Sequence, residues 1–219
     1  MDRERRYGAQ LSAFDLQAIS GKTLQYYDEN ASSFCTGTAD HDVDQNIDAL
    51  LAAISGLPPF RILDFGCGPG RDLNKFKSLG HEPVGLDGSA AFVSMAQRSS
   101  GCEVLRQDFL ALDLPASYFD GVFANASLFH VPQQELARVL ATLWQTLKPD
   151  GVFFASNPRG NNQEGWSANR YGCFHDLDQW RGYVVEAGFK ELRHYYRPPG
   201  RSRDQQPWLA TVWRKPDAD

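Results

Sequence analysis

The fold of this chain is decided by residues 60–70, which read Phe60-Arg61-Ile62-Leu63-Asp64-Phe65-Gly66-Cys67-Gly68-Pro69-Gly70. The apolar residues 60–65 predict a short buried strand, and glycines at alternate positions follow it. Because glycine has no Cβ, its backbone can turn sharply and approach a ligand closely. A helix expected over residues 72–79 would direct its first amide groups at that ligand. A plain tight turn would also use these glycines, so the interpretation depends on the flanking sequence.

Around this loop, short apolar runs alternate with amphipathic segments. Strands are expected at 60–65, 83–86, 102–105, 119–123 and 152–155. Helices are expected at 72–79, 90–98, 134–147 and 176–187, and two helical patterns lie between residues 21 and 56. Such alternation predicts parallel strands joined by right-handed crossovers. Two final strand-like runs, 189–196 and 209–214, are close in sequence and are expected to pair as an antiparallel edge.

The totals fit one domain. The chain has 219 residues, of which 42% are hydrophobic and 22% charged, so it can bury a sizeable core. We expect a flexible N-terminus over residues 1–20 and a single domain over residues 21–219. Residues 157–172 show no periodicity and are expected to form a long structureless loop. They belong to a segment, 157–207, that we expect to carry substrate-facing loops, because long loops in compact domains are usually functional.

Charge and cysteine usage exclude several classes of function. The net charge is −5 and no basic stripe is visible, which argues against nucleic acid without excluding tRNA. No apolar run approaches roughly 18 residues, and no secretory signal opens the chain. The four cysteines form no CxxC pair, so we expect reduced thiols and no metal site. The expectation is a cytoplasmic protein, monomeric or homodimeric, that acts on a small molecule away from membranes.

A single acid ends the second predicted strand. Asp87 follows the glycine loop by about 20 residues, the separation at which a carboxylate can hydrogen-bond the hydroxyls of a ribose. The dinucleotide fingerprint GxGxxG would require glycine where this chain has Arg71, so the loop departs from the nicotinamide and flavin type. Asp87 could instead cap the helix that follows.

Five motifs in order, within residues 22–156, resemble those of the class I S-adenosylmethionine-dependent methyltransferases. They are Asp64-x-Gly66-x-Gly68-x-Gly70, Asp87, Gln107-Asp108-Phe109, Phe119-Asp120-Gly121-Val122 leading to Asn125-Ala126, and Leu147-Lys148-Pro149-Asp150-Gly151. The resemblance implies an α/β, Rossmann-like three-layer sandwich. Its seven-stranded sheet would be mostly parallel with the last strand antiparallel, and an N-terminal helix would form a lid.

The resemblance also implies S-adenosylmethionine as the cofactor. Gly66, Gly68 and Gly70 would contact its methionine part, and Asp64 would order the loop or bind the amino group. The other implied cofactor contacts are Asp87, Gly88, Ser89, Asp108, Phe109, Asn125, Ala126 and, from the lid, Tyr27. Tyr27 could alternatively be an ordinary packing residue of the helix.

The acceptor side is expected in the loops after the fourth and fifth strands. His130 is the candidate catalytic residue, because an imidazole with a pKa near 6.5 can accept a proton or hydrogen-bond an acceptor. It could instead brace its loop. Arg159, Arg170 and Tyr171 are expected to contact the substrate, since guanidinium groups bind carboxylates in bidentate fashion.

The sequence thus predicts a methyltransferase that acts on a small polar, amino-acid-like metabolite. A narrower resemblance, carried by the runs from Gly101 to Val104, Asn157 to Gly160 and Gln205 to Leu209, is to the methyltransferase module of ovothiol biosynthesis enzymes. It implies an imidazole nitrogen of 5-thiohistidine as the acceptor atom. Two alternatives stay open: a methyltransferase acting on tRNA or protein, and a module that binds the cofactor without turnover.

Overall fold

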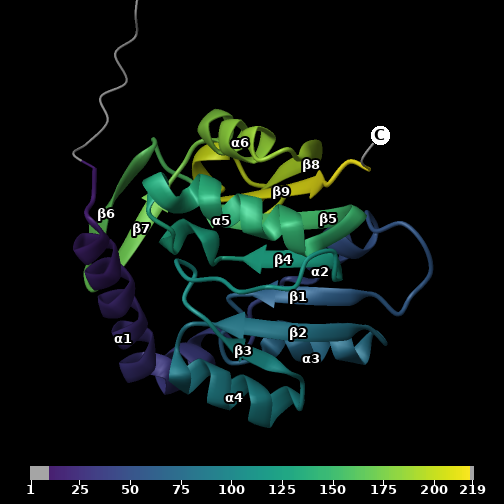
Figure 1. Cartoon of the computed structure of the whole chain (residues 1–219), viewed down its shortest axis with the longest axis horizontal. Coiled ribbons are helices and arrows are strands. Elements are labelled where there is room, and N and C mark those ends of the chain that lie inside the picture. The colour runs from purple at the N-terminus through teal and green to yellow at the C-terminus, as the bar shows by residue number, and fades with distance from the viewer. Residues whose placement is uncertain (1–9, 218–219) are drawn as a thin grey trace, which may run out of the picture.

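The apolar runs assemble into one seven-stranded sheet. The computed structural model describes residues 10–217. The strands lie in the order β3-β2-β1-β4-β5-β9-β8 (Figure 1). Their bounds are Arg61–Phe65 (β1), Glu82–Asp87 (β2), Val104–Arg106 (β3), Phe119–Asn125 (β4), Leu147–Pro158 (β5), Lys190–Arg197 (β8) and Trp208–Arg214 (β9). Each expected strand is therefore present within a few residues of its predicted bounds.

The direction of the strands places a site at one edge. β1 pairs in parallel with β2 and β4, and the parallel pairing continues to β3 and β5. The last strand of the chain, β9, runs antiparallel between β5 and β8, which confirms the predicted direction. The strand order reverses between β1 and β4, and open α/β sheets bind ligands outside the carboxyl ends of strands at such a point.

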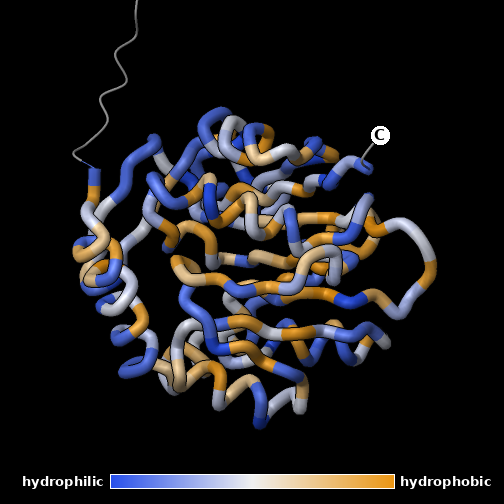
Figure 2. Tube along the Cα trace, viewed as in Figure 1, coloured by the Kyte–Doolittle hydropathy of each residue, from blue (hydrophilic) through white to orange (hydrophobic). Residues whose placement is uncertain are grey.

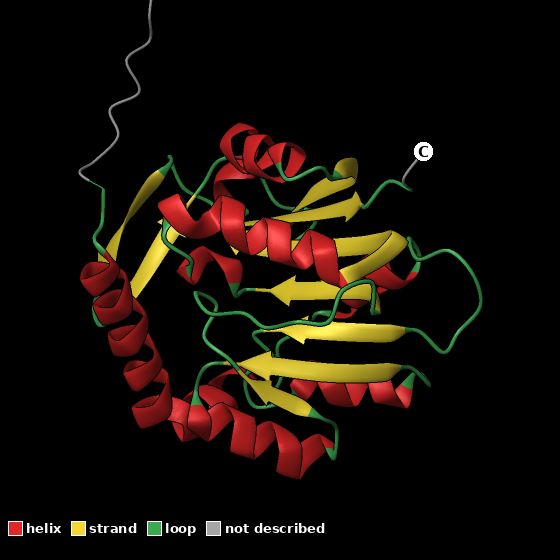
Figure 3. Cartoon of the chain, in the orientation of Figure 1, coloured by secondary structure: helices red, strands yellow, loops and turns green. Residues whose placement is uncertain are grey.

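Helices cover both faces of the sheet (Figure 3). Their bounds are Ala13–Thr38 (α1), Asp44–Leu51 (α2), Arg71–Ser78 (α3), Ala90–Ser100 (α4), Gln133–Thr146 (α5) and Leu177–Glu186 (α6). The apolar side chains of α5 and α6 pack on one face, and those of α2 and α3 on the other. The result is the three-layer α/β sandwich of a Rossmann-like fold. Within residues 10–217 no helix is both long and apolar enough to cross a bilayer.

Alternation along the strands divides the core into two layers. In β5, Phe153 packs toward α5 and α6, whereas the next residue, Phe154, packs toward α2. Phe154 stacks on Phe123 of β4 with ring centroids 4.9 Å apart. Hydrophobic residues follow the central strands in Figure 2, as expected for a sheet buried on both faces. The predicted turn at 149–151 lies inside β5 as an irregularity, where Asp150 has a φ of 60° and the register with β4 shifts.

The N-terminal helix begins earlier than the sequence pattern indicated. Residues 13–20 are helical rather than loosely held, so the predicted flexible segment is wrong for them, and residues 1–9 lie outside the described part. Ser12 accepts a hydrogen bond from the amide of Asp15, whose carboxylate accepts one from the amide of Ser12. This reciprocal capping box fixes the helix start. α1 passes beside the carboxyl ends of the strands (Figure 1).

The expected structureless loop after β5 is also wrong. It contains a β-hairpin, β6 (Gln163–Ser167) paired antiparallel with β7 (Arg170–Phe174). Ala168 has a φ of 53° in the connection, and Trp166 lies opposite Tyr171 with ring centroids 5.5 Å apart. The outer strand is mostly exposed and polar, so it lacks the apolar alternation by which sequence reasoning finds strands. The hairpin lies against α1 (Figure 1).

Replacing Leu143, a fully buried residue of α5, by alanine is expected to lower the free energy of unfolding by about 2–5 kcal/mol, because the cavity left behind cannot collapse completely. Chemical denaturation monitored by circular dichroism would measure this loss. Gln145→Ala, at an exposed position of the same helix, is the matched control and should change stability little. Equal losses in the two variants would contradict the assigned packing of α5.

Candidate active site

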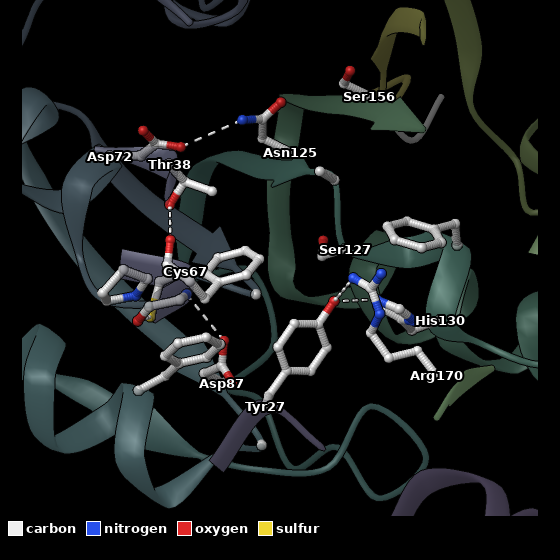
Figure 4. A pocket seen from close by; sticks show the side chains of 18 of the residues that line it. Tyr27, Thr38, Cys67, Asp72, Asp87, Asn125, Ser127, His130, Ser156 and Arg170 are labelled. Atoms are coloured by element: carbon white, nitrogen blue, oxygen red, sulfur yellow. Dashed lines mark hydrogen bonds between the residues drawn. The ribbon is translucent and has the colours of Figure 1, made fainter. Parts of the chain in front are cut away.

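A cavity of about 710 Å³ opens at the carboxyl ends of the strands, under α1. Its walls come from the loops after β1, β2, β3 and β4, from α1 and the start of α3, and from residues of β5, β7, β8 and β9. The cavity therefore lies where the sheet order reverses. Figure 4 shows side chains from these separate segments pointing into one space.

The glycine loop after β1 forms the floor of the cavity. The amides of Gly66 and Cys67 donate to the carbonyl of Leu86, so the loop is tied to the end of β2. Gly66 has a φ of 80°, and a Cβ there would lie 2.4 Å from the Cβ of Ser127. A side chain at Gly66 is thus excluded both by backbone conformation and by space.

The three predicted glycines do not share one role. Gly66 and Gly68 line the cavity. Gly70 does not: it precedes α3 with a φ of 94°, and a Cβ there would lie 2.9 Å from the Cα of Ala96 in α4. Gly70 therefore allows α3 and α4 to approach each other, and its effect on a ligand is indirect.

Asp87 joins the glycine loop to the loop after β2. Its Oδ2 accepts from the amide of Gly68 at 3.0 Å and its Oδ1 from the amide of Ser89 at 2.9 Å. Burial raises the pKa of Asp87 to about 6, although these amides favour the charged form. Helix capping belongs to Ser89, whose Oγ accepts from the amide of Phe92. Asp87 is left as a buried carboxyl at the cavity wall.

Asp64 lies behind the loop rather than in the cavity. It is 2% exposed, and within residues 10–217 its Oδ2 has no hydrogen-bond partner. Burial, and then the neighbouring Asp72 carboxylate, raise the pKa of Asp64 well above its usual range. Asp72 itself is paired with Arg71 at 2.7 Å. Asp64 can therefore act on a ligand only through the loop that it supports.

The predicted adenine motif lies beside the glycine loop, where a Cβ at Gly66 would be 3.2 Å from the Phe109 ring. Asp108 and Phe109 both line it. Phe109 stacks on Phe65 with centroids 4.2 Å apart, which presents a flat apolar wall. Asp108 accepts from the amide of Leu110 at 2.8 Å and from the Oγ of Ser20 at 2.5 Å. Ser20 belongs to α1, and sequence reasoning did not identify it, because a serine on a polar helix face carries no signal.

Further contacts hold α1 over the cavity. Asp28 accepts from the Oγ of Ser89 at 2.6 Å and from the amide of Ala91 at 3.0 Å. This carboxylate sits at the N-terminus of α4, where the helix dipole favours negative charge. Leu24 packs so closely on Gly88 that a Cβ at Gly88 would lie 2.6 Å from a Leu24 methyl group. Gly88 lines the cavity, whereas Ser89 is fully buried and acts by holding α1.

Asn125 and Ala126 form the wall at the end of β4. The Oδ1 of Asn125 accepts from Asn46 of α2 at 3.0 Å, and its Nδ2 donates to Asp72 at 3.4 Å. Asn46 was also missed, since a buried asparagine within an amphipathic helix looks like a surface residue. Ala126 has a φ of 61°, a strained conformation for a residue with a Cβ, and lies in the cavity lining.

Both ring nitrogens of His130 are hydrogen-bonded within the protein, and Figure 4 shows the contact with Tyr27. Its Nδ1 lies 2.6 Å from the carbonyl oxygen of Tyr171 and its Nε2 2.7 Å from the Oη of Tyr27. Since a carbonyl only accepts, Nδ1 carries the proton and Nε2 accepts the Tyr27 hydroxyl. Burial, with the Arg170 charge adding to it, lowers the pKa of His130 to about 4. The expectation of a pKa near 6.5 is therefore wrong.

The other residues predicted to contact the acceptor lie in different places. Arg170 lines the cavity: its Nη1 lies 3.4 Å from the Oη of Tyr27, and its guanidinium lies 5.0 Å from the Tyr26 ring centroid. Among residues 10–217 no carboxylate forms an ion pair with it. Tyr171 contributes its carbonyl to His130 while its ring packs on Trp166.

Arg159 lies outside the cavity. Its Nη2 donates to the carbonyl of Arg203 at 2.8 Å, and its guanidinium covers the ring of Tyr196. It lines a separate, smaller cavity with residues of α6. The hairpin explains the separation, because β6 and β7 carry Arg170 back toward α1 while Arg159 stays at the end of β5.

Comparison with known proteins identifies the family. A model of the methyltransferase domain matches residues 62–151, which run from β1 through the turn in β5. Over this matched region the chain is a class I S-adenosylmethionine-dependent methyltransferase domain. A 1,6-didemethyltoxoflavin-N1-methyltransferase of Burkholderia thailandensis, solved with 1,6-didemethyltoxoflavin and S-adenosylhomocysteine, has the same fold. Its TM-score is 0.75 at 22% identity, over 96% of this chain and 94% of that one.

The curated relatives of this methyltransferase domain act on different acceptors. A malonyl-[acyl-carrier protein] O-methyltransferase of Salmonella typhimurium is 28% identical over 66% of this chain and 53% of its own length. A sterol 24-C-methyltransferase of Yarrowia lipolytica is 31% identical over 59% of this chain and 34% of its own. The chain spans about half the length of the first curated relatives it matches. These relatives give the resemblance to the ovothiol module no specific support.

The buried His130 of this methyltransferase domain is expected to make stability depend on pH. Its pKa is about 4 in the folded state and 6.5 ordinarily, so the unfolded chain takes up the proton first. The free energy of unfolding of the wild type, measured relative to that of His130→Gln, should thus be highest above pH 6.5. It should fall by about 1.4 kcal/mol per unit as pH drops from 6.5 to about 4.

Denaturant unfolding of the two proteins at several pH values measures this difference. The comparison with the variant is needed because Asp87, whose pKa is raised to about 6, changes stability in the opposite direction in both proteins. A difference that stays constant across this range would show that His130 is not buried in its neutral form.

Proposed function

We propose that this chain binds S-adenosylmethionine and transfers its methyl group to a small polar acceptor. The observation that carries the proposal is Asp87, a buried carboxyl that faces the cavity directly beside the glycine loop. A carboxylate at the end of β2 can accept hydrogen bonds from both hydroxyls of a ribose, and it disfavours a 2′-phosphate. The family membership of residues 62–151 supports the same ligand.

The residues at the site fit this cofactor. The cavity floor at Gly66 has no room for a Cβ. The methionine part of the cofactor would therefore meet the backbone there rather than a side chain. Phe109 offers a flat surface for the adenine, with Asp108 beside it as an acceptor for the amino group. Asn125 and Ala126 would lie beside the methionine part. The cavity volume of about 710 Å³ lies in the upper part of the range of ligand pockets, roughly 300–1,000 Å³, which supports space for a second molecule.

The cofactor supplies an electrophilic methyl group, so the protein needs chiefly to align the acceptor and exclude water. α1 performs the second task by covering the cavity through Ser20, Leu24 and Asp28. Alignment of the acceptor falls to the part of the cavity beyond β4. Ser156 of β5 and Trp208 of β9 line this part, away from the Asp87 loop.

Arg170 supports an acceptor with an anionic group. It is a cavity residue with no carboxylate partner among residues 10–217, so its positive charge is available for a ligand. An amino-acid-like metabolite carries the carboxylate that a guanidinium binds best. The imidazole nitrogen of 5-thiohistidine is one acceptor atom of this kind. The Burkholderia thailandensis enzyme, solved with bound 1,6-didemethyltoxoflavin, supports a small-molecule acceptor.

Incubation with methyl-labelled S-adenosylmethionine and a small-molecule extract tests the proposal. A labelled small product is expected. Label in the precipitable fraction would point to a protein or tRNA acceptor, and a steep loss of binding with salt would identify RNA. Binding of the cofactor without any labelled product would identify a binding module and overturn the proposed reaction.

Asp87→Ala is expected to weaken binding of S-adenosylhomocysteine by roughly 10- to 100-fold, because hydrogen bonds to a charged group are worth about 1.5–3 kcal/mol. Titration calorimetry measures the dissociation constant, and circular dichroism confirms that the variant is folded. Affinity of the wild type should also fall as pH drops through about 6, where the Asp87 carboxylate is protonated. Unchanged affinity in the variant would remove the ribose assignment.

Arg170→Met is expected to raise the acceptor KM by roughly 10- to 100-fold with little change in cofactor affinity, since it removes one charge-assisted pair. Steady-state kinetics with the acceptor found in the labelling assay measures this change. Arg159→Met is the matched control, because Arg159 lies outside the cavity. Equal KM values for the Arg170 variant and the control would exclude Arg170 from acceptor binding.

A further inference from the structure

The pair Tyr27–His130 has a fixed direction of hydrogen bonding. His130 donates from Nδ1 to the carbonyl of Tyr171, an atom that cannot donate in return. Its Nε2 must then accept, and the Oη of Tyr27 at 2.7 Å is the donor. Tyr27 therefore has its hydroxyl proton directed at an imidazole lone pair before any ligand binds.

Tyr27, and not His130, presents a free lone pair toward a ligand. Both side chains line the cavity, but the imidazole has each nitrogen occupied within the protein. The Oη of Tyr27 donates once, receives a long contact of 3.4 Å from Arg170, and keeps acceptor capacity for one more hydrogen. In Figure 4 the phenol reaches across the cavity between Asp87 and His130.

The surroundings raise the pKa of Tyr27 and lower the pKa of His130. For Tyr27, burial raises the pKa first, Arg170 lowers it, and Asp87 and Tyr26 raise it. For His130, burial and Arg170 lower the pKa, while the Tyr171 carbonyl raises it. The phenol of Tyr27 therefore keeps its hydroxyl proton in the resting protein. It can accept another proton only if it donates its own to a neighbour at the same time.

We infer that Tyr27 takes the proton that the methyl acceptor loses and passes its own hydroxyl proton to Nε2 of His130. This inference rests on the proposed function. The reacting atom of the acceptor loses its bond to hydrogen and gains a bond to the methyl carbon, whose bond to the sulfonium sulfur breaks with the electron pair staying on sulfur. That proton arrives on Oη of Tyr27, the Tyr27 proton arrives on Nε2, and the His130 ring holds both protons as an imidazolium. One proton then leaves to solvent, which restores the starting state for the next turnover.

The relay limits the class of acceptor. It is useful only when the reacting nitrogen or oxygen carries a hydrogen that must be lost, as in an imidazole, an amine or a hydroxyl group. A carboxylate oxygen or a thioether sulfur is methylated without losing a proton and would leave the pair without a task. The geometry thus favours an N–H or O–H acceptor over a carboxylate or thioether acceptor.

A purely structural pair would behave differently. The same contacts also join α1 to the β6–β7 hairpin, since Tyr27 belongs to α1 and Tyr171 to β7. If bracing were its only role, glutamine at position 130 could replace the imidazole, because its side chain can accept from a hydroxyl. Glutamine cannot take up a proton in this range, so it separates the two roles.

Nitrogen-15 NMR of histidine-labelled protein in complex with S-adenosylhomocysteine tests the arrangement without an acceptor. We expect the His130 ring to be protonated at Nδ1 and unprotonated at Nε2, and Tyr27→Phe to shift the Nε2 signal. Tyr26→Phe keeps the ring beside Arg170 and should leave that signal unchanged. A protonated Nε2 in the complex, or an Nε2 signal indifferent to Tyr27→Phe, would overturn the relay.

Turnover with the acceptor identified by labelling gives the second readout. Tyr27→Phe and His130→Gln are each expected to reduce kcat by about 100- to 10,000-fold, the range for general acid–base catalysis, while binding of S-adenosylhomocysteine shows that each variant is folded. The losses in the two variants should not add, because both break one relay. Near-normal kcat in His130→Gln would reduce the pair to a brace and refute the relay. A wild type that fails to bind S-adenosylhomocysteine would instead refute the proposed function.

Discussion

The two hydrogen bonds accepted by the buried carboxyl of Asp87 hold the site together. One comes from the loop after β1 and the other from the loop after β2, so a single side chain sets the distance between them. Gly66, Gly68 and Gly88 line the cavity without side chains, so their positions depend on the backbone. The backbone amides therefore converge on one negative charge, and that charge is left at the wall of the cavity.

α1 depends on the same loops. It is pinned through Ser89, the residue that caps α4, and through Asp108 after β3. Its other contacts reach the opposite side of the cavity, at His130 and Tyr171. One helix thus bridges the two halves of the sheet on either side of the point where the strand order reverses. This position explains why the described cavity is covered although its walls come from separate strand ends.

Sequence reasoning was strongest where local pattern and tertiary role coincide. The glycine loop, Asp87 and the strands around them could be placed because a buried parallel strand is apolar over its whole length. It failed where the pattern was polar: β6 is exposed, and the first turns of α1 depend on a cap at Ser12. Ser20 and Asn46 were missed because their roles arise from contacts between distant segments. The neutral state of His130 likewise depends on burial that a sequence does not reveal.

The β6–β7 hairpin forms a two-stranded sheet that shares no strand with the main one. It contributes Arg170 and the carbonyl that orients His130, yet none of the residues grouped around Asp87. Insertions or exchanges between β5 and α6 would therefore change this part of the cavity wall while the loops around Asp87 keep their contacts. The hairpin is a peripheral ribbon whose sequence can vary without rebuilding the seven-stranded scaffold.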